Sequence, residues 1–147
     1  MREPARIELI HLIYCSTATH EMSESELLEL LQVARQRNLP LKVTGMLLYG
    51  GGVFLQVLEG PAASVDMLYK KLERDPRHHS LFLLEREPVS ERSFPDWSMG
   101  FHHLTPQEET RFAGAFSLRQ PGHGLDKPGL QPGVALDLLR QFARSQR

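Results

Sequence analysis

The sequence predicts an α+β fold whose elements follow the order β-α-β-β-α-β-β. Three observations predict it: a triple glycine divides two apolar, β-branched runs at residues 41–60, a capped amphipathic segment begins at Ser23, and another begins after Pro61. The two helices are expected on one face of a single sheet. Because the strand patterns are apolar on both faces, helices near the C-terminus are expected to cover the other face.

The size and composition of the chain indicate one domain with a short extension. In a chain of 147 residues we expect a sheet domain over residues 1–104 and a helical extension over residues 105–147. A net charge of −1 gives no general attraction to nucleic acid or to an anionic membrane. The sequence shows neither the roughly 20 apolar residues of a membrane span nor a secretory signal, so we expect a cytoplasmic protein.

The first strand and the first helix are predicted from residues 7–41. Both faces of residues 7–15 are mostly apolar, which is typical of a central strand covered on two sides. Ser23 and Glu26 then have the spacing of a helix capping box. We expect this helix to end around Asn38 and Pro40.

The hairpin at residues 41–60 is the centre of the predicted sheet. Its three consecutive glycines supply a turn that needs positive φ. On its second strand, Gln56 lies on the same face as Phe54 and Leu58, among apolar neighbours. A buried amide group left unpaired costs about 1–3 kcal/mol, so Gln56 requires a polar partner inside the domain.

The second half of the chain predicts one more helix, two strands and two C-terminal helices. The helix after Pro61 is expected to end at the Asp-Pro pair of residues 75–76. Residues 80–85 are predicted to form a strand buried on both faces, and residues 97–101 a last strand. The expected apolar faces are Trp97, Met99 and Phe101 in that strand, Phe112, Ala113 and Phe116 in the third helix, and Ala135, Leu138, Leu139 and Phe142 in the fourth.

Seven histidines raise the question of a metal site. In the adjacent pairs at residues 78–79 and 102–103, neighbouring side chains on a strand point to opposite faces, so neither pair can chelate as a unit. Cys15 has no second thiol with which to bind zinc or form a disulfide. Ser16 and His11 lack the turn that positions a nucleophile. We therefore expect neither a metal site nor a serine hydrolase.

Several polar side chains are expected around the groove between the first two helices. Tyr14 can share a sheet face with Gln56, and its hydroxyl needs a partner when buried. Spacing alone leaves simpler explanations open. Tyr14 can be an ordinary core tyrosine, Asn38 a helix C-cap, and Arg77 and His78 part of a solvated helix end.

Six motifs lie in order along residues 7–104: LIYCSTAT, ARQRN, VTGMLLY, GVFLQVLEG, DPRHH and RSFPDWSMGF. Together they resemble the BLUF family, the blue-light sensors that use flavin. The resemblance implies a ferredoxin-like sheet with an oxidised flavin between its two helices, FAD with FMN as the alternative. The tail length resembles the short stand-alone members without an attached enzyme domain, so no enzymatic activity is expected.

The resemblance also implies roles for single residues. Tyr14 matches the photoactive tyrosine, Gln56 the switching glutamine, and Asn38 the asparagine bonded to the flavin carbonyl edge. The other matches are Met99 and Trp97, which respond to light, Arg77 and His78 near the pyrimidine end of the ring, and the weaker pocket candidates Ser16 and Thr44.

Two positions depart from the family pattern. Arg37 stands where some members have a histidine or asparagine against the ring, and Val57 stands where one subgroup has a tryptophan.

The function implied by the resemblance is a photoreceptor in which light rearranges the hydrogen bonds between Tyr14, Gln56 and the flavin. The change would pass to the C-terminal helices and control a downstream protein partner. A homo-oligomer is expected, and neither nucleic acid nor membrane is an expected partner. Two alternatives stay open: an acylphosphatase-like hydrolase, although the loop STATHEMS offers no arginine for phosphate, and a light-insensitive scaffold module.

Overall fold

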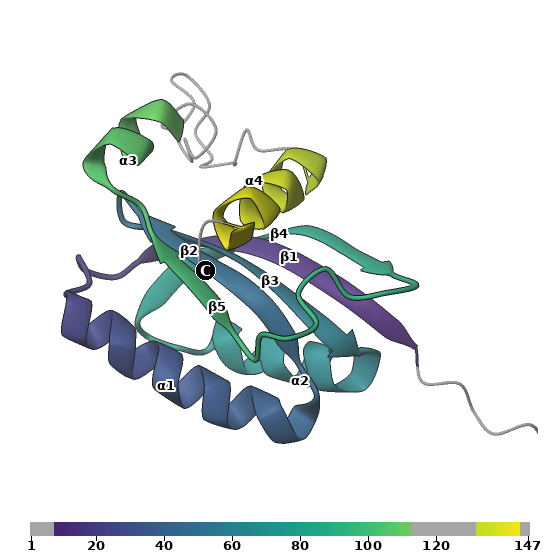
Figure 1. Cartoon of the computed structure of the whole chain (residues 1–147). Helices are drawn as coiled ribbons and strands as arrows, with labels where there is room; N and C mark the ends of the chain where they lie inside the picture. The colour runs from purple at the N-terminus through teal and green to yellow at the C-terminus, as the bar shows by residue number, and fades with distance from the viewer. Residues whose placement is uncertain (1–7, 113–131, 145–147) are drawn as a thin grey trace, which may run out of the picture.

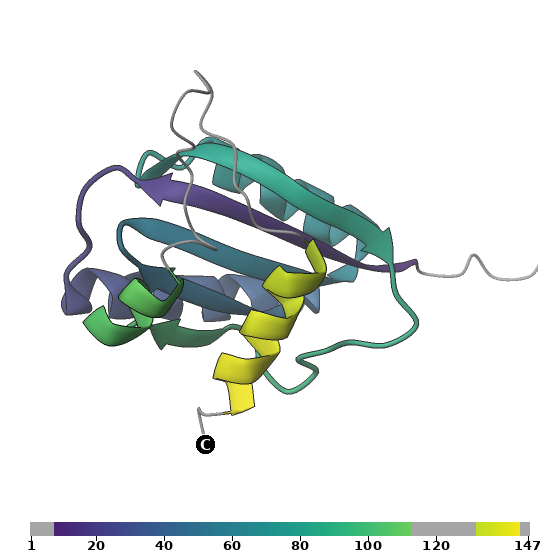
Figure 2. The same ribbon diagram turned by 90° about the horizontal axis from the view of Figure 1, so that it is seen from above.

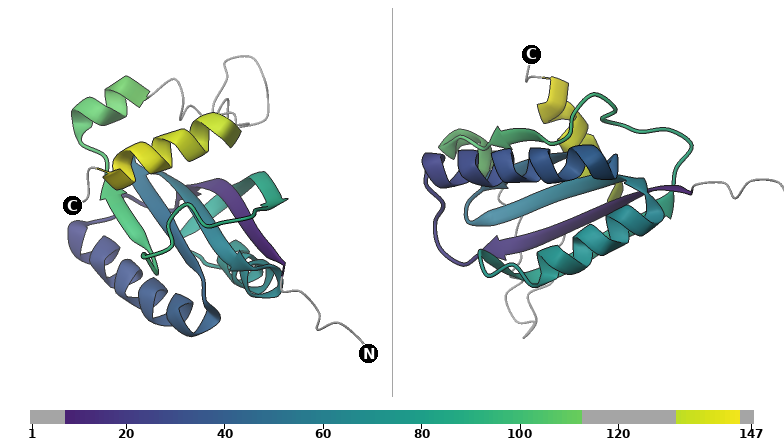
Figure 3. Two further views of the ribbon diagram at one scale, coloured as in Figure 1. Left: turned by 45° about the vertical axis from the view of Figure 1, so that its right-hand side comes forward. Right: turned by 90° about the horizontal axis from the view of Figure 1, so that it is seen from below.

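The computed structural model describes residues 8–112 and 132–144 as a five-stranded sheet with helices on both faces (Figure 1). Helices α1 and α2 cover one face, and α4 covers the other (Figure 3). The elements are β1 (Leu9–Ala18), α1 (Glu24–Leu41), β2 (Thr44–Gly50), β3 (Val53–Pro61), α2 (Ala62–Glu73), β4 (His78–Pro88), β5 (Gly100–His103), α3 (Pro106–Phe112) and α4 (Pro132–Arg144).

The strands lie in the order β4-β1-β3-β2-β5. The first four are antiparallel to their neighbours, and β5 runs parallel to β2 at the edge. This order is that of a ferredoxin-like βαββαβ sheet with one added strand, so the predicted fold is confirmed. β1 and β3 are the central strands, and nearly all of their residues are buried.

The glycine-rich turn has the predicted geometry. Gly51 and Gly52 have φ of 58° and 76° and join β2 to β3, while Gly50 is the last residue of β2. Glycine adopts this left-handed region without the strain that a Cβ atom would cause. The tight turn fixes the register that places Leu47 opposite Gln56.

Helix α1 begins as predicted and ends later. The Ser23 side chain accepts a hydrogen bond from the Glu26 backbone, and the Glu26 carboxylate accepts one from the Ser23 backbone. The helix continues through Pro40, and Lys42 closes it in the left-handed conformation with φ of 58°. Asn38 is therefore a buried residue within the helix, and its interpretation as a C-cap is wrong.

Strand β4 corrects a prediction, because it is an edge strand. It runs from His78 to Pro88, pairs only with β1 in the sheet, and exposes half of Leu83. The prediction of a strand buried on both faces is wrong. A continuous apolar run does not reveal how many strands flank it.

The last strand is shorter than predicted. β5 begins at Gly100, and Trp97 and Met99 belong to the irregular segment before it. Met99 is buried among core residues under α1 and α2, whereas Trp97 packs with Phe94 in the cluster under α4. The prediction that Trp97 and Met99 share one side is wrong, because side chains alternate regularly only within a strand.

The second face of the sheet is covered by α4, as predicted. This helix runs across the strands (Figure 2). Its buried residues pack against Ile13, Leu55 and Val57 from the sheet; they are Ala135, Leu138, Leu139, Phe142 and Ala143.

Helix α3 begins with the predicted cap, since Thr105 and Glu108 exchange hydrogen bonds between side chain and backbone. The Glu109 carboxylate accepts a hydrogen bond from the Gly51 backbone, which places α3 near the hairpin turn. The predicted apolar contacts of Ala113 and Phe116 lie outside the described residues. Within the part of the chain that the structure describes, no helix is long and apolar enough to cross a membrane.

Candidate functional site

A narrow slot lies against the sheet, between α1 and α2. Its lining combines apolar and polar side chains from both helices, the sheet and the start of β4. The apolar ones are Leu30, Val33, Ala34, Leu47, Phe54 and Leu72, and the polar ones are Tyr14, Gln56, Arg37, Asp75, Arg77 and His78. The slot therefore brings together five of the predicted site residues, Tyr14, Gln56, Arg37, Arg77 and His78, with an apolar wall.

The base of the slot holds a chain of three linked side chains. The Tyr14 hydroxyl donates a hydrogen bond to Oε1 of Gln56, and Nε2 of Gln56 donates one to the Met99 sulfur at 3.3 Å. Tyr14 and Gln56 are direct cross-strand partners on β1 and β3, so the sheet itself sets this pairing. The partner that the buried amide requires is Tyr14.

The Tyr14 phenol stays protonated. Burial raises its pKa well above the ordinary value, the neighbouring Tyr69 raises it further, and the positive charge of Arg37 opposes the shift. The ring of Tyr69 packs against it edge to face, with centroids 5.4 Å apart. A neutral phenol is a hydrogen-bond donor, as its bond to Gln56 needs.

Two α1 side chains hold the segment that precedes β5. Nδ2 of Asn38 donates to the Ser98 carbonyl oxygen at 2.8 Å, and Nε of Arg35 donates to the Met99 carbonyl oxygen at 2.9 Å. Asn38 is fully buried. These bonds fix the backbone on which Met99 sits next to Gln56.

The rim of the slot carries charge. Arg77 and Asp75 form an ion pair with a shortest separation of 2.5 Å, and hydrogen bonds from Arg77 hold the Asp75 pKa below its usual value. Arg37 is half-buried, and loss of water around its guanidinium lowers its pKa. Its one hydrogen bond among the described residues is a long one, 3.5 Å, to Oδ1 of Asn38.

Ser16 and His78 form one polar group at the β1 end of the slot. Ser16 is fully buried, and its hydroxyl lies 2.7 Å from Nδ1 of His78. Nε2 of His78 lies 2.5 Å from the Leu72 carbonyl oxygen, at the end of α2. The ring is thereby fixed between β1, β4 and α2.

Two predicted site residues are not brought to the slot. Trp97 lies on the α4 side, with its ring 6.4 Å from that of Phe94. Thr44 donates a hydrogen bond to Glu59 at 3.2 Å and accepts one from Arg92 at 2.8 Å, away from the slot.

Sequence reasoning missed a buried carboxylate clamp at Glu59. This side chain is 1% exposed, and its carboxylate accepts hydrogen bonds from the backbone of Ser93 at 2.5 Å and of Phe94 at 2.8 Å. Arg92 binds the carbonyl oxygens of Glu59 and Lys42. A charged residue at the end of an apolar strand was the available signal, because a buried carboxylate requires donors. The Glu59 clamp anchors the loop that leads to Met99.

The fold and slot together define a ligand-binding α+β domain with a hydrogen-bonded phenol and amide at the base of its site. Residues 9–100 match the family model described as BLUF, sensors of blue-light using FAD. The chain therefore belongs to the BLUF family, and these residues form a blue-light sensor domain that uses FAD.

Similar proteins include light-regulated enzymes and regulators. The chain is 40% identical over 92 residues to photoactivated adenylate cyclase subunit beta of Euglena longa, a match that covers 62% of this chain and 11% of that protein. It is 36% identical over 100 residues to the blue light- and temperature-regulated antirepressor BluF of Escherichia coli (strain K12), covering 68% of this chain and 25% of that one. The chain thus spans about a tenth of the cyclase subunit and a quarter of BluF.

A solved structure matches over nearly its whole length. The dark-state structure of BlrB, a BLUF protein, superposes with a TM-score of 0.73 at 32% identity and covers 94% of this chain and 97% of that one. The predicted family is confirmed.

The residues of the slot fit a flavin in their chemistry. The apolar wall suits the faces of an aromatic ring. Arg37 makes only one long hydrogen bond among the described residues, so its other donors suit the carbonyl edge of the ring. Gln56 uses one amide N–H on a thioether, a weak acceptor, so a carbonyl oxygen would be a better partner. The cavity at the base measures about 40 Å³. A three-ring ligand is larger than this cavity, so side chains that line the slot must move apart to admit it.

Proposed function

We propose that Tyr14, Gln56 and Met99 form the light-responsive relay of this sensor. The main support is the continuous chain of hydrogen bonds at the base of the slot, which runs from the phenol to the amide to the thioether. When bound, the flavin supplies a blue-absorbing ring that becomes a strong oxidant on excitation. Tyr14 is the electron and proton source, because its buried hydroxyl already donates to Gln56.

Gln56 acts as the switch because its amide has a donor end and an acceptor end. In the structure its oxygen accepts from Tyr14 and its nitrogen donates to Met99. Rotation or tautomerisation exchanges these ends and changes the hydrogen bonds offered to the ligand, which shifts the flavin absorption to the red. After rotation, an amide oxygen faces the Met99 sulfur. A thioether cannot donate a hydrogen bond, so Met99 is displaced.

Other slot residues bind and orient the flavin. Arg37 lines the slot and binds the carbonyl edge, and Asn38 joins it there by exchanging its bond to the Ser98 carbonyl oxygen for one to the ligand. Arg77 and His78 hold the pyrimidine end, and the bond of Ser16 to His78 fixes that imidazole. FAD is the cofactor of the family, and the slot chemistry is equally suited to the ring of FMN. Thr44 has an indirect role, through the Glu59 clamp.

The signal leaves the slot through the segment before β5. A Cβ atom on Gly100 would lie 2.1 Å from the Trp97 ring, so the ring rests directly on the backbone next to Met99. Trp97 packs with Phe94, and Arg140 of α4 donates a hydrogen bond to Ser93 at 2.9 Å. Displacement of Met99 therefore moves Trp97 and loosens α4, within the helical extension of residues 105–147.

The output is control of a protein partner by α4 rather than catalysis by this chain. The antirepressor BluF is an example of a relative with a regulatory name. The protein acts in the cytoplasm, where the lone buried thiol of Cys15 needs no oxidising compartment. It forms a homo-oligomer through the apolar surface of α1 around Leu28 and Leu39, which are 62% and 72% exposed.

The decisive experiment is a Tyr14→Phe substitution in the flavin-loaded protein, read by visible absorption before and after blue light. We expect retained yellow colour and no red shift, because phenylalanine cannot supply the hydroxyl proton. Tyr69→Phe is the matched control, since Tyr69 contacts Tyr14 edge to face and makes no hydrogen bond to Gln56 among the described residues. A full red shift in Tyr14→Phe would refute the relay. A wild-type protein that binds flavin and never shifts would instead favour the scaffold alternative.

A further inference from the structure

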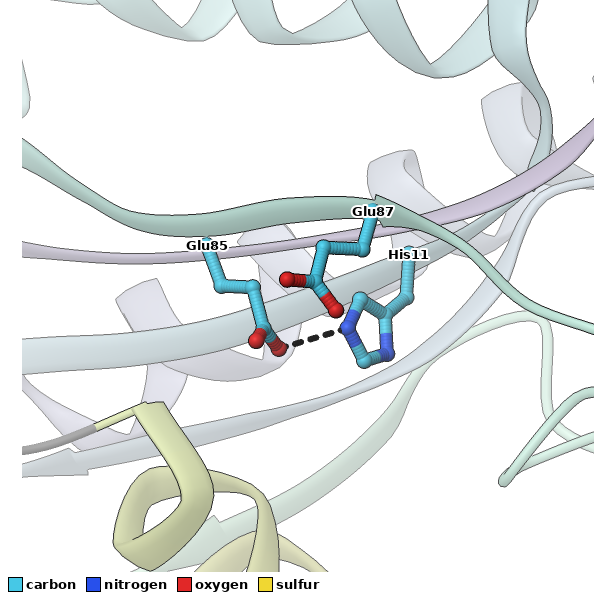
Figure 4. A group of neighbouring side chains, drawn as sticks. All are labelled: His11, Glu85 and Glu87. Atoms are coloured by element: carbon cyan, nitrogen blue, oxygen red, sulfur yellow. Dashed lines mark hydrogen bonds and ion pairs between the residues drawn. The ribbon is translucent and has the colours of Figure 1, made fainter.

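Three metal-ligating side chains converge on the face of the sheet opposite the slot. Nε2 of His11 lies 2.7 Å from a carboxylate oxygen of Glu85, and one ligand atom from each of His11, Glu85 and Glu87 lies within 4.8 Å of the others. Figure 4 shows the imidazole of β1 and the two carboxylates of β4 facing one another.

The strand register positions this triad. His11 is the direct cross-strand partner of Glu87, and Glu85 lies two residues earlier on β4, on the same face. The register shifts of this strand pair occur further along, after Ile13. All three side chains therefore stand on regular, paired backbone, which holds ligands more precisely than a loop does.

The surroundings of the triad favour a cation. His11 is 7% exposed, Glu85 is half-buried and Glu87 is exposed. Two carboxylates on one strand face repel each other. Glu59 adds a third acidic group directly opposite His11 on β3, although its own carboxylate is engaged by the loop at Ser93. A divalent ion between Glu85 and Glu87 would neutralise both of their charges.

We propose that His11, Glu85 and Glu87 bind one divalent transition-metal ion, with Zn²⁺ as the best match. Zn²⁺ accepts imidazole nitrogen and carboxylate oxygen at about 2.0–2.2 Å, and three protein ligands with a water in the fourth position form a common tetrahedral site. In such a site neighbouring ligand atoms lie roughly 3.3 Å apart. Rotamer changes of the two glutamates suffice to bring the three ligand atoms, now within 4.8 Å of one another, to that spacing. The exposed side of Glu87 supplies the entry path and the water position.

Ligand chemistry separates Zn²⁺ from other common cations. Mg²⁺ and Ca²⁺ select oxygen ligands in six-coordinate or higher geometry, and an imidazole nitrogen is a poor choice for them. The ion would join the edge strand β4 to the central strand β1. It therefore stabilises the folded chain by an amount that rises with the logarithm of the free metal concentration once this exceeds the dissociation constant.

The test is isothermal titration of ZnCl₂ into the untagged full chain, loaded with flavin and kept in the dark. We expect one saturable equivalent and a higher melting temperature. Glu85→Gln and Glu87→Gln are each expected to weaken binding by at least about tenfold, since each loses an anionic ligand. MgCl₂ is expected to bind far more weakly than ZnCl₂.

His20→Gln is the matched control. His20 and Glu26 form another 2.7 Å histidine–carboxylate pair, but no third ligand joins it among the metal-binding groups of the described residues. This variant should bind Zn²⁺ as the wild type does. Retention of the tight equivalent by either glutamate variant, or no Zn²⁺ uptake by the wild type, would overturn the proposal. Because the titration needs no light response, its result is independent of the relay at Tyr14 and Gln56.

Discussion

Tyr14 and Gln56 are hydrogen-bond partners inside the domain, so each buried polar group depends on the other for its partner. The Tyr14 hydroxyl and the Gln56 oxygen are buried, and each would be left without a partner by removal of the other. An unpaired buried polar group costs about 1–3 kcal/mol. The pair is therefore a structural bond as well as the proposed photochemical one, and a variant must be read for both properties.

Gln56→Leu separates these two properties. We predict that the variant keeps flavin and its yellow colour, loses the light-induced red shift, and lowers the free energy of unfolding by about 1–3 kcal/mol, because the Tyr14 hydroxyl loses its acceptor. Absorption spectra and urea unfolding measure the two effects. Gln32→Leu, at an exposed position of α1, controls for the change of side chain. A normal red shift in Gln56→Leu would exclude the amide as the switch.

Individual residues were predictable wherever alternation along a strand decides the face. Tyr14 and Gln56 lie in regular strands, so their meeting in the slot follows from period-two alternation and the hairpin register. Trp97 lies in an irregular segment, where the same rule gave the wrong face. The triad at His11 escaped prediction because 74 residues separate His11 from Glu85, and only the pairing of β1 with β4 unites them.

At the scale of elements, local signals predicted the start of α1 and the position of the hairpin turn, and long-range pairing decided exposure. The capping box at Ser23 and the glycine turn at residues 51–52 each depend on a few neighbouring residues, and both have the predicted form. The exposure of β4 depends on its place at the edge of the sheet, which the apolar run at residues 80–85 does not encode. Strand order arises from packing of the whole chain.

The Glu59 clamp makes the loop before β5 a defined element. Glu59→Gln keeps the size of the side chain but presents an N–H₂ group to a site built from the Ser93 and Phe94 backbone donors. We predict a loss of about 1–3 kcal/mol in the free energy of unfolding. We also predict a changed rate of dark recovery, since the loop carries Met99. Flavin binding itself should be unaffected.

Glu91→Gln tests the specificity of that prediction within the same loop. Glu91 is exposed, so removal of its charge should leave both stability and dark recovery near the wild-type values. Urea unfolding and the decay of the red-shifted absorption after a light pulse measure the two quantities. Equal behaviour of Glu59→Gln and Glu91→Gln would show that the clamp does not position the loop.

On the scale of the whole molecule, one sheet separates two differently used faces. Gln56 of β3 faces the slot, while its neighbours Leu55 and Val57 face α4. Alternate residues of β3 belong to the two hydrophobic cores. Only the backbone of this strand therefore separates a change at the slot from the residues that contact α4. Coupling between the faces then requires that α4 stay packed on the sheet, so that a movement of the sheet also displaces the helix.

Leu139→Ala measures how firmly α4 is bound. Leu139 is fully buried against the sheet, and its truncation leaves a cavity between α4 and the central strands. Large-to-small changes at such positions cost about 2–5 kcal/mol. If α4 and the sheet unfold as one cooperative unit, we predict a loss of that size in the global free energy of unfolding. Urea denaturation measures it.

Val134→Ala is the matched control, because Val134 lies on the same helix and is 48% exposed. It should change the global stability by less than about 0.5 kcal/mol, as surface substitutions do. The alternative outcome for Leu139→Ala is a small global effect with rapid hydrogen exchange confined to α4, which would mean that the helix detaches independently of the sheet. In that case light could not act on a partner by repacking α4 through Trp97, and the output would have to leave the domain from another surface.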